Sequence, residues 1–274
     1  MPEANKKTAY SVGVGNIPNQ IHELAGRTGI EFNVMCLGDK KVGKKMFLKT
    51  IFGVDVCGEE CDERCGDIKR WEHVIVENGF HLKLGVAVTS NIRETESVSG
   101  YIEKEMKQYL KGYTDQRAEM AAKDGRVHLF FYFFSVHRRR LSEKALKLLE
   151  KIGKMTNLIV VVPKGDILTE NEKKRLFRDI RGQLTERSIR LYENTFQQPV
   201  FSVSGEKEHQ VAGHERSRSE IVHGRKYSWG TVDSRDPNLY SFESLRDVLI
   251  RKETYGLIQS AQKKQTEMYG GVRK

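Results

Sequence analysis

The residues that are most informative about chemistry lie at positions 38–45, which read Gly-Asp-Lys-Lys-Val-Gly-Lys-Lys. The frame Gly-x-x-x-x-Gly-Lys is typical of a phosphate-binding loop. Gly38 and Gly43 let backbone N–H groups converge on phosphate oxygens, and Lys44 would neutralise the β- and γ-phosphates. An apolar run at 30–37 precedes the loop and a helical pattern follows it, so the helix would add its positive N-terminal end. The expected phosphate-binding residues are Gly38, Lys41, Val42, Gly43, Lys44, Lys45 and Met46.

The last position of this frame departs from the usual pattern. Lys45 stands where Ser or Thr would hold a magnesium ion. Together with Lys40, Lys41 and Lys44 it crowds one short loop, and each close like-charge pair costs on the order of 1 kcal/mol at a surface-like dielectric. A bound polyphosphate would reverse that cost, whereas an empty loop would leave the lysines in solvent. The pattern therefore leaves binding of a nucleoside di- or triphosphate open, and no Mg²⁺ is expected.

Composition limits the class of protein. The chain has 274 residues, of which 31% are charged and 38% hydrophobic, which is enough to bury a full core as one large domain. No apolar stretch approaches the ~20 residues that a membrane span needs, and the first residues lack the apolar segment of a signal peptide. These features predict a cytoplasmic protein. The net charge of +10 favours anionic partners, but without zinc-finger spacing or an aromatic nucleic-acid motif we expect no nucleic acid among them.

Three of the four cysteines, Cys57, Cys61 and Cys65, recur every four residues. On a helix they would share one face, and thiolates bind zinc. A structural zinc site usually has four ligands, and no fourth ligand lies nearby. Free thiols are the interpretation that we favour.

Strand-like and helix-like patterns alternate along the chain, which predicts an α/β fold with a largely parallel sheet. Stripes of apolar residues at three- and four-residue spacing predict helices around 47–51, 141–152 and 176–184, and the last thirty residues also look helical. The segment 205–228 is rich in Gly, Ser, His and charge and is expected to be a long irregular connection. The expected strands are 30–37, 71–76, 82–88, 127–134, 158–162 and 199–203.

A second motif follows the apolar run at 158–162, where the sequence reads Pro163-Lys164-Gly165-Asp166. In guanine-specific sites, a Lys-x-Asp pair occupies this place. The carboxylate accepts hydrogen bonds from the guanine N1–H and 2-amino groups, while the lysine stem lies along the base. A surface turn after the strand is the alternative interpretation.

With these motifs in order, nearly the whole chain resembles the septins, the filament-forming guanine-nucleotide-binding proteins of the cytoskeleton. The most specific match is the stretch 224–230, Gly-Arg-Lys-Tyr-Ser-Trp-Gly, which is similar to the septin unique element. Arg126-Val-His128 before an aromatic strand resembles another family stretch. The resemblance implies a P-loop GTPase-like three-layer fold with a mostly parallel central sheet and a septin-type C-terminal element. It also implies that the guanine base is bound by Lys164, Asp166, Gly205 and Arg225.

The resemblance further implies three regions. These are an N-terminal segment or helix at 1–28, a GTPase-like core at 29–205, and the septin unique element with a C-terminal helix at 206–274. No heptad-rich tail follows that helix in the sequence given.

The sequence departs from the septin pattern at the positions that contact the metal and the γ-phosphate in that family. Val88-Thr-Ser-Asn91 stands where the family has Asp-Thr-Pro-Gly, whose Asp serves the metal's outer shell and whose Gly N–H contacts the γ-phosphate. Phosphoryl transfer depends on positioning and on metal charge. With Lys45 also changed, we expect negligible GTP hydrolysis and no catalytic residue.

Resemblance to septins also implies partners. The chain is expected to assemble with other septin-like subunits, through nucleotide-side and terminal interfaces, into filaments or rings at the cytoskeleton and cell cortex that act as a scaffold in cell division. Mixed assemblies are expected in preference to filaments of this chain alone. Arg139 occupies the place of a family histidine that reaches the neighbouring subunit's nucleotide, and Trp229 is also expected at an interface. A solvated basic turn is the alternative for Arg139.

Membrane contact is expected to be weak. The basic stretch that binds phosphoinositides in many septins is reduced here to the segment 22–27, and each basic residue near an anionic surface contributes only about 1 kcal/mol. Two other functions remain open: an active guanine-nucleotide switch whose metal is held by other residues, and a phosphoinositide-binding membrane scaffold.

Overall fold

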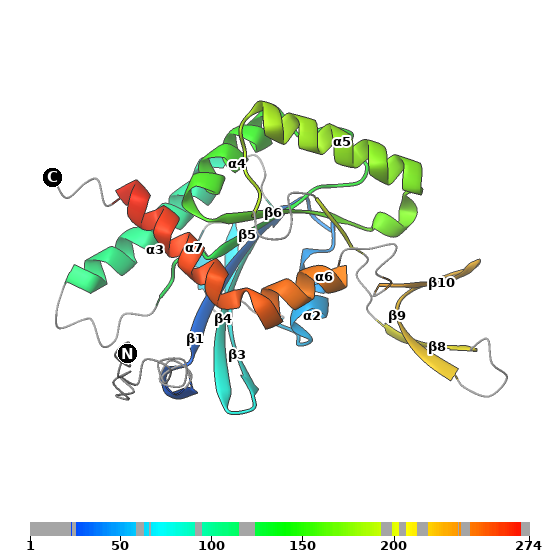
Figure 1. Ribbon diagram of the computed structural model, residues 1–274, viewed down its shortest axis with the longest axis horizontal. Coiled ribbons are helices and arrows are strands. Elements are labelled where there is room, and N and C mark those ends of the chain that lie inside the picture. The colour runs from blue at the N-terminus through cyan, green and yellow to red at the C-terminus, as the bar shows by residue number, and fades with distance from the viewer. Residues whose placement is uncertain are drawn as a thin grey trace, which may run out of the picture.

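A seven-stranded sheet lies between two layers of helices in the computed structural model (Figure 1). The structure describes residues 23, 26–58, 63–65, 67–90, 95–114, 124–192, 199–202, 207–212, 219–234, 236 and 242–269. The three-layer α/β fold expected from the sequence is confirmed.

The main sheet has the strand order β2-β3-β4-β1-β5-β6-β7. Neighbours from β4 to β7 are parallel, while β3 pairs antiparallel with β4, and β2 antiparallel with β3. All six predicted strands are present, with ends that differ by a few residues. The strands are β1 (Ile30–Gly38), β2 (Glu63–Cys65), β3 (Ile68–Glu77), β4 (Phe80–Thr89), β5 (Leu129–Phe133), β6 (Asn157–Pro163) and β7 (Val200–Ser202).

Central strands are apolar on both faces because helices cover both sides. In β5, Phe131 and Phe133 pack into one core cluster, and Phe130 and Tyr132 pack into the other. This alternation follows from the two-residue period of a strand. The central strands therefore have continuous apolar sequences, not sequences in which apolar and polar residues alternate.

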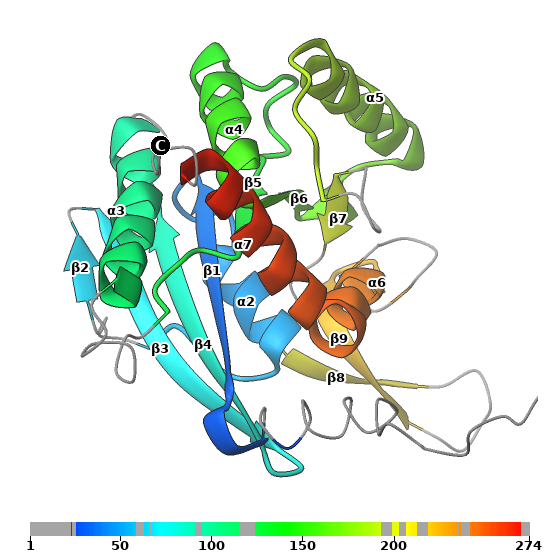
Figure 2. The same ribbon diagram turned by 60° about the vertical axis from the view of Figure 1, so that its left-hand side comes forward.

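Helices α2, α6 and α7, with the π-helix η3, cover one face, and α3, α4 and α5 cover the other. Figure 2 shows α7 lying across the face that α2 also covers. The predicted helices are present, but α3 was not predicted. The bounds are α2 (Lys44–Phe52), α3 (Thr95–Thr114), α4 (Glu143–Met155), the short 3₁₀ helix η2 (Gly165–Ile167), α5 (Glu170–Glu186), α6 (Phe242–Arg246), η3 (Asp247–Lys252) and α7 (Thr254–Tyr269).

The last helix is docked onto the sheet by polar contacts as well as by its apolar face. The Asn157 side-chain amide donates to the Leu257 backbone oxygen at 2.7 Å, and the Ser260 hydroxyl donates to Asn157 Oδ1 at 2.8 Å. Lys264 Nζ reaches the Thr156 backbone oxygen at 3.1 Å. Because these partners are 100 or more residues apart in sequence, α7 is part of the same folded body as the sheet.

The expectation of an irregular connection at 205–228 is wrong. Two strands, β8 (Lys207–Ala212) and β9 (Ser219–Tyr227), pair antiparallel there, and β10 (Gly230–Asp233) completes a second, three-stranded sheet. Figure 1 shows this sheet set apart from the main one, beyond α6. Its strands pair with one another, so a polar composition is compatible with strand structure here.

Within the described residues, no helix is both long and apolar enough to cross a membrane. Of the proposed N-terminal region, only residues 23 and 26–28 are described, and they are helical.

Candidate nucleotide-binding site

The loop between β1 and α2 has the backbone of an anion-binding turn. Gly43, immediately before the helix, has φ 109°, and Lys41 has φ 60°. A lysine held in the left-handed region stores strain of the kind found at ligand-binding loops. Gly43 offers no capping side chain, and the first turn of α2 contains no acidic residue. No side chain at the cap therefore competes with an anion for the backbone N–H groups of the helix start.

Lys44 is fixed beneath this loop. The residue is 6% exposed, and its ammonium donates to the backbone oxygens of Gly38 and Asp39, each at 2.8 Å, and to Ser90 Oγ at 3.0 Å. Burial lowers the pKa of Lys44 from 10.5 to about 8, although the neighbouring Cys36 and Asp39 favour the charged form. The ammonium is still mainly protonated at neutral pH and can neutralise a phosphate.

Lys45 and Val88, at the two expected metal positions, do not provide ligands for magnesium. The ammonium of Lys45 lies against the backbone oxygens of Cys57 and Gly58, and Val88 is buried. An ammonium and an aliphatic side chain offer no oxygen to a hard cation. The described residues contain no group of three or more His, Cys, Asp or Glu side chains that could hold a metal ion. A resident Mg²⁺ therefore does not fit the side chains at these positions.

At the end of β6, Asp166 presents a buried carboxylate. Its side chain is fully buried, and Oδ2 accepts hydrogen bonds from Arg225 Nη1 at 3.4 Å and from the Tyr227 hydroxyl. Oδ1 is buried and has no hydrogen-bond partner in the described structure. Burial raises the pKa of Tyr227, and its hydrogen bond to Asp166 raises it further. The hydroxyl is thus held in the protonated form that donates to the carboxylate.

A lysine connects the two motifs. Lys164 has φ 60°, another non-glycine residue in the left-handed region, and its Nζ lies 3.5 Å from the Lys41 backbone oxygen. The contact joins residues 123 positions apart. Lys41 and Lys164 thus both lie in the left-handed region, which non-glycine residues adopt rarely and often at functional segments.

A cavity of about 1160 Å³ opens over the phosphate loop. It is lined by the loop and α2 on one side and by β3, β4 and the residues flanking them on the other. Lys164, Asp166 and Arg225 are not part of its lining. The loop therefore borders an open hollow, and Asp166 and Arg225, which are expected to bind the base, form a separate cluster in which the carboxylate is buried.

Comparison with known proteins decides the family. A family model described as "Septin" matches residues 28–273. The chain belongs to the septin family. It is 28% identical to "Septin-2" of Mus musculus over 272 residues, covering 90% of this chain and 75% of that protein. It is 27% identical to "Neuronal-specific septin-3" of Danio rerio over 292 residues, covering 96% and 79%.

The fold comparison agrees with this assignment. A solved structure titled "Crystal structure of Septin GTPase domain from Chlamydomonas reinhardtii" superposes with a TM-score of 0.64 at 15% identity, covering 87% of this chain and 97% of that one. This similarity shows that the septin has the fold of a septin GTPase domain. Members of the family generally bind guanine nucleotides and form oligomers with other septins.

Most sequence-predicted residues of this septin lie together in the two clusters. Lys41, Val42, Gly43, Lys44, Lys45 and Met46 line the large cavity, and Gly38 contributes the carbonyl that holds Lys44. Lys164, Asp166 and Arg225 come together as described. Gly205, Asn91 and Cys61 lie outside the described residues. Cys36 and Cys57 are free thiols, and because Cys57 lies in a loop and Cys65 in β2, the helical cysteine face is not formed.

Sequence reasoning missed several residues of the site. Asp67, Lys69 and Trp71 line the cavity from the start of β3, and their two-residue spacing is the only signal that would have placed them on one face. Tyr227 belongs to the stretch 224–230, whose sequence predicts no role for it, although its hydroxyl reaches Asp166. Its partner lies 61 residues away, so no local pattern could have revealed the contact.

At the predicted interface of this septin, the arginine that meets the phosphate loop is Arg138. Arg138 Nη2 pairs with Asp39 Oδ1 at 3.0 Å, whereas Arg139 is exposed. Trp229 is 70% exposed and stacks on Tyr227, with ring centroids 5.0 Å apart. The roles of Arg139 and Trp229 at an interface remain predictions.

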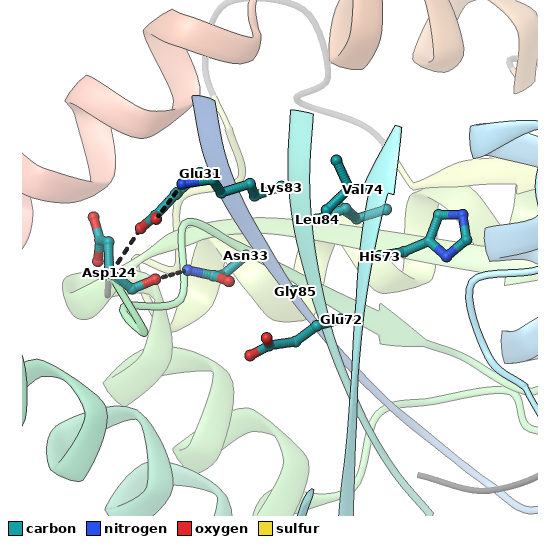
Figure 3. A pocket seen from close by; sticks show the side chains of 9 residues that line it. All are labelled: Glu31, Asn33, Glu72, His73, Val74, Lys83, Leu84, Gly85 and Asp124. Carbon is teal, nitrogen blue, oxygen red and sulfur yellow. Dashed lines mark hydrogen bonds and ion pairs between the residues drawn. The ribbon is translucent and has the colours of Figure 1, made fainter. Parts of the chain in front are cut away.

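A second, smaller hollow of about 140 Å³ lies toward the start of β1, away from the phosphate loop. Figure 3 shows Glu31 and Asp124 close together there, with the Asn33 amide donating to the Asp124 backbone oxygen at 2.5 Å. Burial would raise the pKa of Asp124, but hydrogen bonds from Arg126 and His128 hold it well below its ordinary value. Lys83 lines the hollow as well and pairs with Glu31, and Arg126 pairs with Asp124. None of the residues expected to bind nucleotide lines it, so we do not assign the nucleotide to this hollow.

Nucleotide affinity of this septin is expected to fall at alkaline pH. In the empty pocket Lys44 loses its proton around pH 8, and a phosphate prefers the charged form. Above that pH binding must take up a proton, so the affinity for GDP should fall by up to about tenfold per pH unit. Titrations with a fluorescent GDP analogue from pH 7 to pH 10 would measure this. Lys44→Met should bind more weakly and show little pH dependence over this range, and equal slopes for both proteins would contradict the role of Lys44.

Proposed function

We propose that this septin binds GDP or GTP as a fixed part of its structure, hydrolyses it negligibly, and assembles with other septin subunits into filaments or rings that act as a scaffold in cell division. The observation that carries nucleotide binding is the Asp166 carboxylate. One of its oxygens is held by Arg225 and Tyr227, and the other is buried without a partner among the described residues. A carboxylate in this state accepts the paired N–H donors of a guanine base.

Loss of hydrolysis is supported by the residues at the expected metal positions. Lys45 and Val88 provide no oxygen ligand, and Ser90 is engaged by Lys44. Without a bound metal, the charge that develops during phosphoryl transfer is not stabilised. Bound nucleotide would then act as a stabilising ligand of the fold.

Assembly is supported by the tip of the β9–β10 hairpin. Trp229 is exposed there and rests on Tyr227, which contacts Asp166. Exposed aromatic residues are common anchors of protein interfaces. We place Trp229 and Arg139 at a nucleotide-side interface with a different septin subunit, in an assembly at the cytoskeleton and cell cortex.

The first experiment is to purify the protein with either magnesium or EDTA, denature it, and identify the released nucleotide by chromatography. We expect close to one GDP or GTP per chain in both preparations. A pocket that is empty in both would contradict nucleotide binding. Release only from the magnesium preparation would contradict metal-free binding.

Turnover and assembly are tested on the same protein. GTP hydrolysis should stay at background with or without magnesium, and magnesium-dependent turnover would favour the alternative of an active switch. Electron microscopy should show filaments only after mixing with other septins, so stable filaments of this chain alone would contradict mixed assembly. Flotation with phosphoinositide vesicles by a nucleotide-free protein would favour the membrane scaffold instead.

A further inference from the structure

The loop after α2 lies beside the phosphate cavity and is packed into the core. Val56 and Cys57 are buried and belong to the same apolar cluster as Trp71 of β3. The Val56 backbone N–H donates to the Val54 oxygen at 3.0 Å. Residues 54–58 are therefore packed against Trp71, which itself lines the large cavity.

One ammonium connects this loop to two other elements. Lys45 projects from the first turn of α2, and its Nζ lies 3.4 Å from the Cys57 backbone oxygen and 3.3 Å from that of Gly58. The same Nζ lies 4.7 Å from the centroid of the Trp71 ring. A lysine over the face of a tryptophan is attracted by the ring quadrupole. Lys45 thus joins the start of α2, the loop after it and β3.

Many nucleotide-dependent proteins contain a mobile segment beside the bound nucleotide. Such segments are ordered by contacts to the γ-phosphate and its metal and are released when those contacts are lost. Here the side chain at the metal-binding position has the charge and the length to make the connection itself. A hydroxyl at position 45 would be too short to reach the carbonyls of Cys57 and Gly58.

The geometry points to Lys45 as a positioning residue that holds residues 54–58 in one arrangement, independently of nucleotide and of magnesium. The part of this inference that concerns insensitivity to nucleotide rests on the proposed function. The positioning of residues 54–58 by Lys45 in nucleotide-free protein does not depend on it. The loop of this septin would then not report whether the pocket contains GDP or GTP.

Cys57 provides a direct readout, because its buried thiol reacts only when the loop opens. Peptide-resolved alkylation would compare the wild type with Lys45→Met, which removes the charge, and Lys45→Arg, which keeps it. Lys49→Met is the matched control, since Lys49 is an exposed lysine one turn later in α2 that reaches Asp55 of the same loop at 3.8 Å. Cys36, buried in β1, serves as the internal reference for global unfolding.

We expect Lys45→Met to speed Cys57 alkylation by between about threefold and tenfold, as for loss of one cation–π contact in a local opening. Lys45→Arg and Lys49→Met should stay near the wild-type rate, and Cys36 should not change. An unchanged Cys57 rate in Lys45→Met would overturn the inference. An equal rise at Cys57 and Cys36 would also overturn it, because the variant would then act by global unfolding.

Tryptophan emission gives an independent measurement. The chain has two tryptophans, so Trp229→Phe leaves Trp71 as the sole emitter. In that background Lys45→Met should shift the emission to longer wavelength and make Trp71 easier to quench with acrylamide, while Lys49→Met should not. Identical spectra for all three proteins would contradict the contact between Lys45 and Trp71.

In the last experiment, Cys57 alkylation of the wild-type protein is measured after adding GDP or a non-hydrolysable GTP analogue, each with magnesium or EDTA. The Cys57 rate should change by less than about twofold in every condition. Strong protection seen only with the GTP analogue and magnesium would refute the inference. A fluorescent GDP titration on the same samples tests the proposed function separately. If GDP does not bind, the proposed function is contradicted, and the results for the nucleotide-free protein alone decide the role of Lys45.

Discussion

Replacing Asp166 with asparagine is expected to weaken GDP binding by roughly a hundredfold. A carboxylate accepts both guanine N–H donors, whereas an amide offers one acceptor and places its NH₂ against the other donor. Hydrogen bonds to a charged group contribute about 1.5–3 kcal/mol each, and 1.4 kcal/mol is tenfold in affinity. The variant also removes the charge that pairs with Arg225. Calorimetric titration with GDP would measure the loss.

Asp166→Asn should also change which base is preferred, and unfolding of the variant would not produce such a change. Xanthine has a carbonyl in place of the 2-amino group of guanine, so the asparagine NH₂ can donate to it. Asp166→Asn should therefore bind xanthosine diphosphate better than GDP. Asp179→Asn, in α5, is the matched control and should leave GDP affinity unchanged. GDP affinity that survives in Asp166→Asn would show that the base is not read by this carboxylate.

Replacing Gly38 with alanine is expected to lower the free energy of unfolding by about 2–3 kcal/mol. A Cβ at this position would lie 2.6 Å from Phe133 Cβ and 3.0 Å from the Phe133 backbone oxygen. Phe133 is in register with Gly38 on the neighbouring central strand, so neither backbone can move aside alone. Overpacking a close-packed core costs about 1–3 kcal/mol, and occasionally more. Denaturant unfolding monitored by circular dichroism would measure it.

Gly182→Ala is the matched control for that change. A Cβ added at Gly182, in the middle of α5, meets nothing within 4 Å. Alanine is a better helix former than glycine, so this variant should gain about 0.5–1 kcal/mol. If both variants shift stability in the same direction, the clash at Gly38 is not the cause of the loss.

The main sheet could be predicted because its central strands are buried on both faces and are therefore continuously apolar. Helix α3 escaped prediction although Val98, Ile102 and Met106 follow helical spacing. The remaining positions of that helix are largely polar, which hides a narrow apolar stripe. Strands β8 and β9 escaped for a different reason. They pair within a separate small sheet and carry many charged and small residues, so their sequence resembles that of a loop.

The candidate site was predictable where its chemistry is local in sequence. The phosphate loop and the Lys164-Gly165-Asp166 turn each occupy a few consecutive residues at the end of a strand, and the structure places both at the same edge of the sheet. The position of the Lys45 ammonium was not predictable, because its partners Cys57, Gly58 and Trp71 depend on how the next loop packs. The contact of Tyr227 with Asp166 likewise depends on how the second sheet packs.

The two hollows give the domain an electrical polarity along β1. Lysines at positions 40, 41, 44, 45 and 69 line the cavity at its carboxyl end and outnumber the two aspartates there, Asp39 and Asp67. Toward its amino end, Glu31, Glu72 and Asp124 line the hollow, and each is paired with a lysine or an arginine. A polyanion approaching from solution is drawn toward the lysines and finds no such attraction at the other end, so the molecule orients its own encounters before any contact is made. Salt shortens the range of that field to about 8 Å at physiological ionic strength. Encounter rates with anionic ligands should therefore depend on salt even where the bound complex does not.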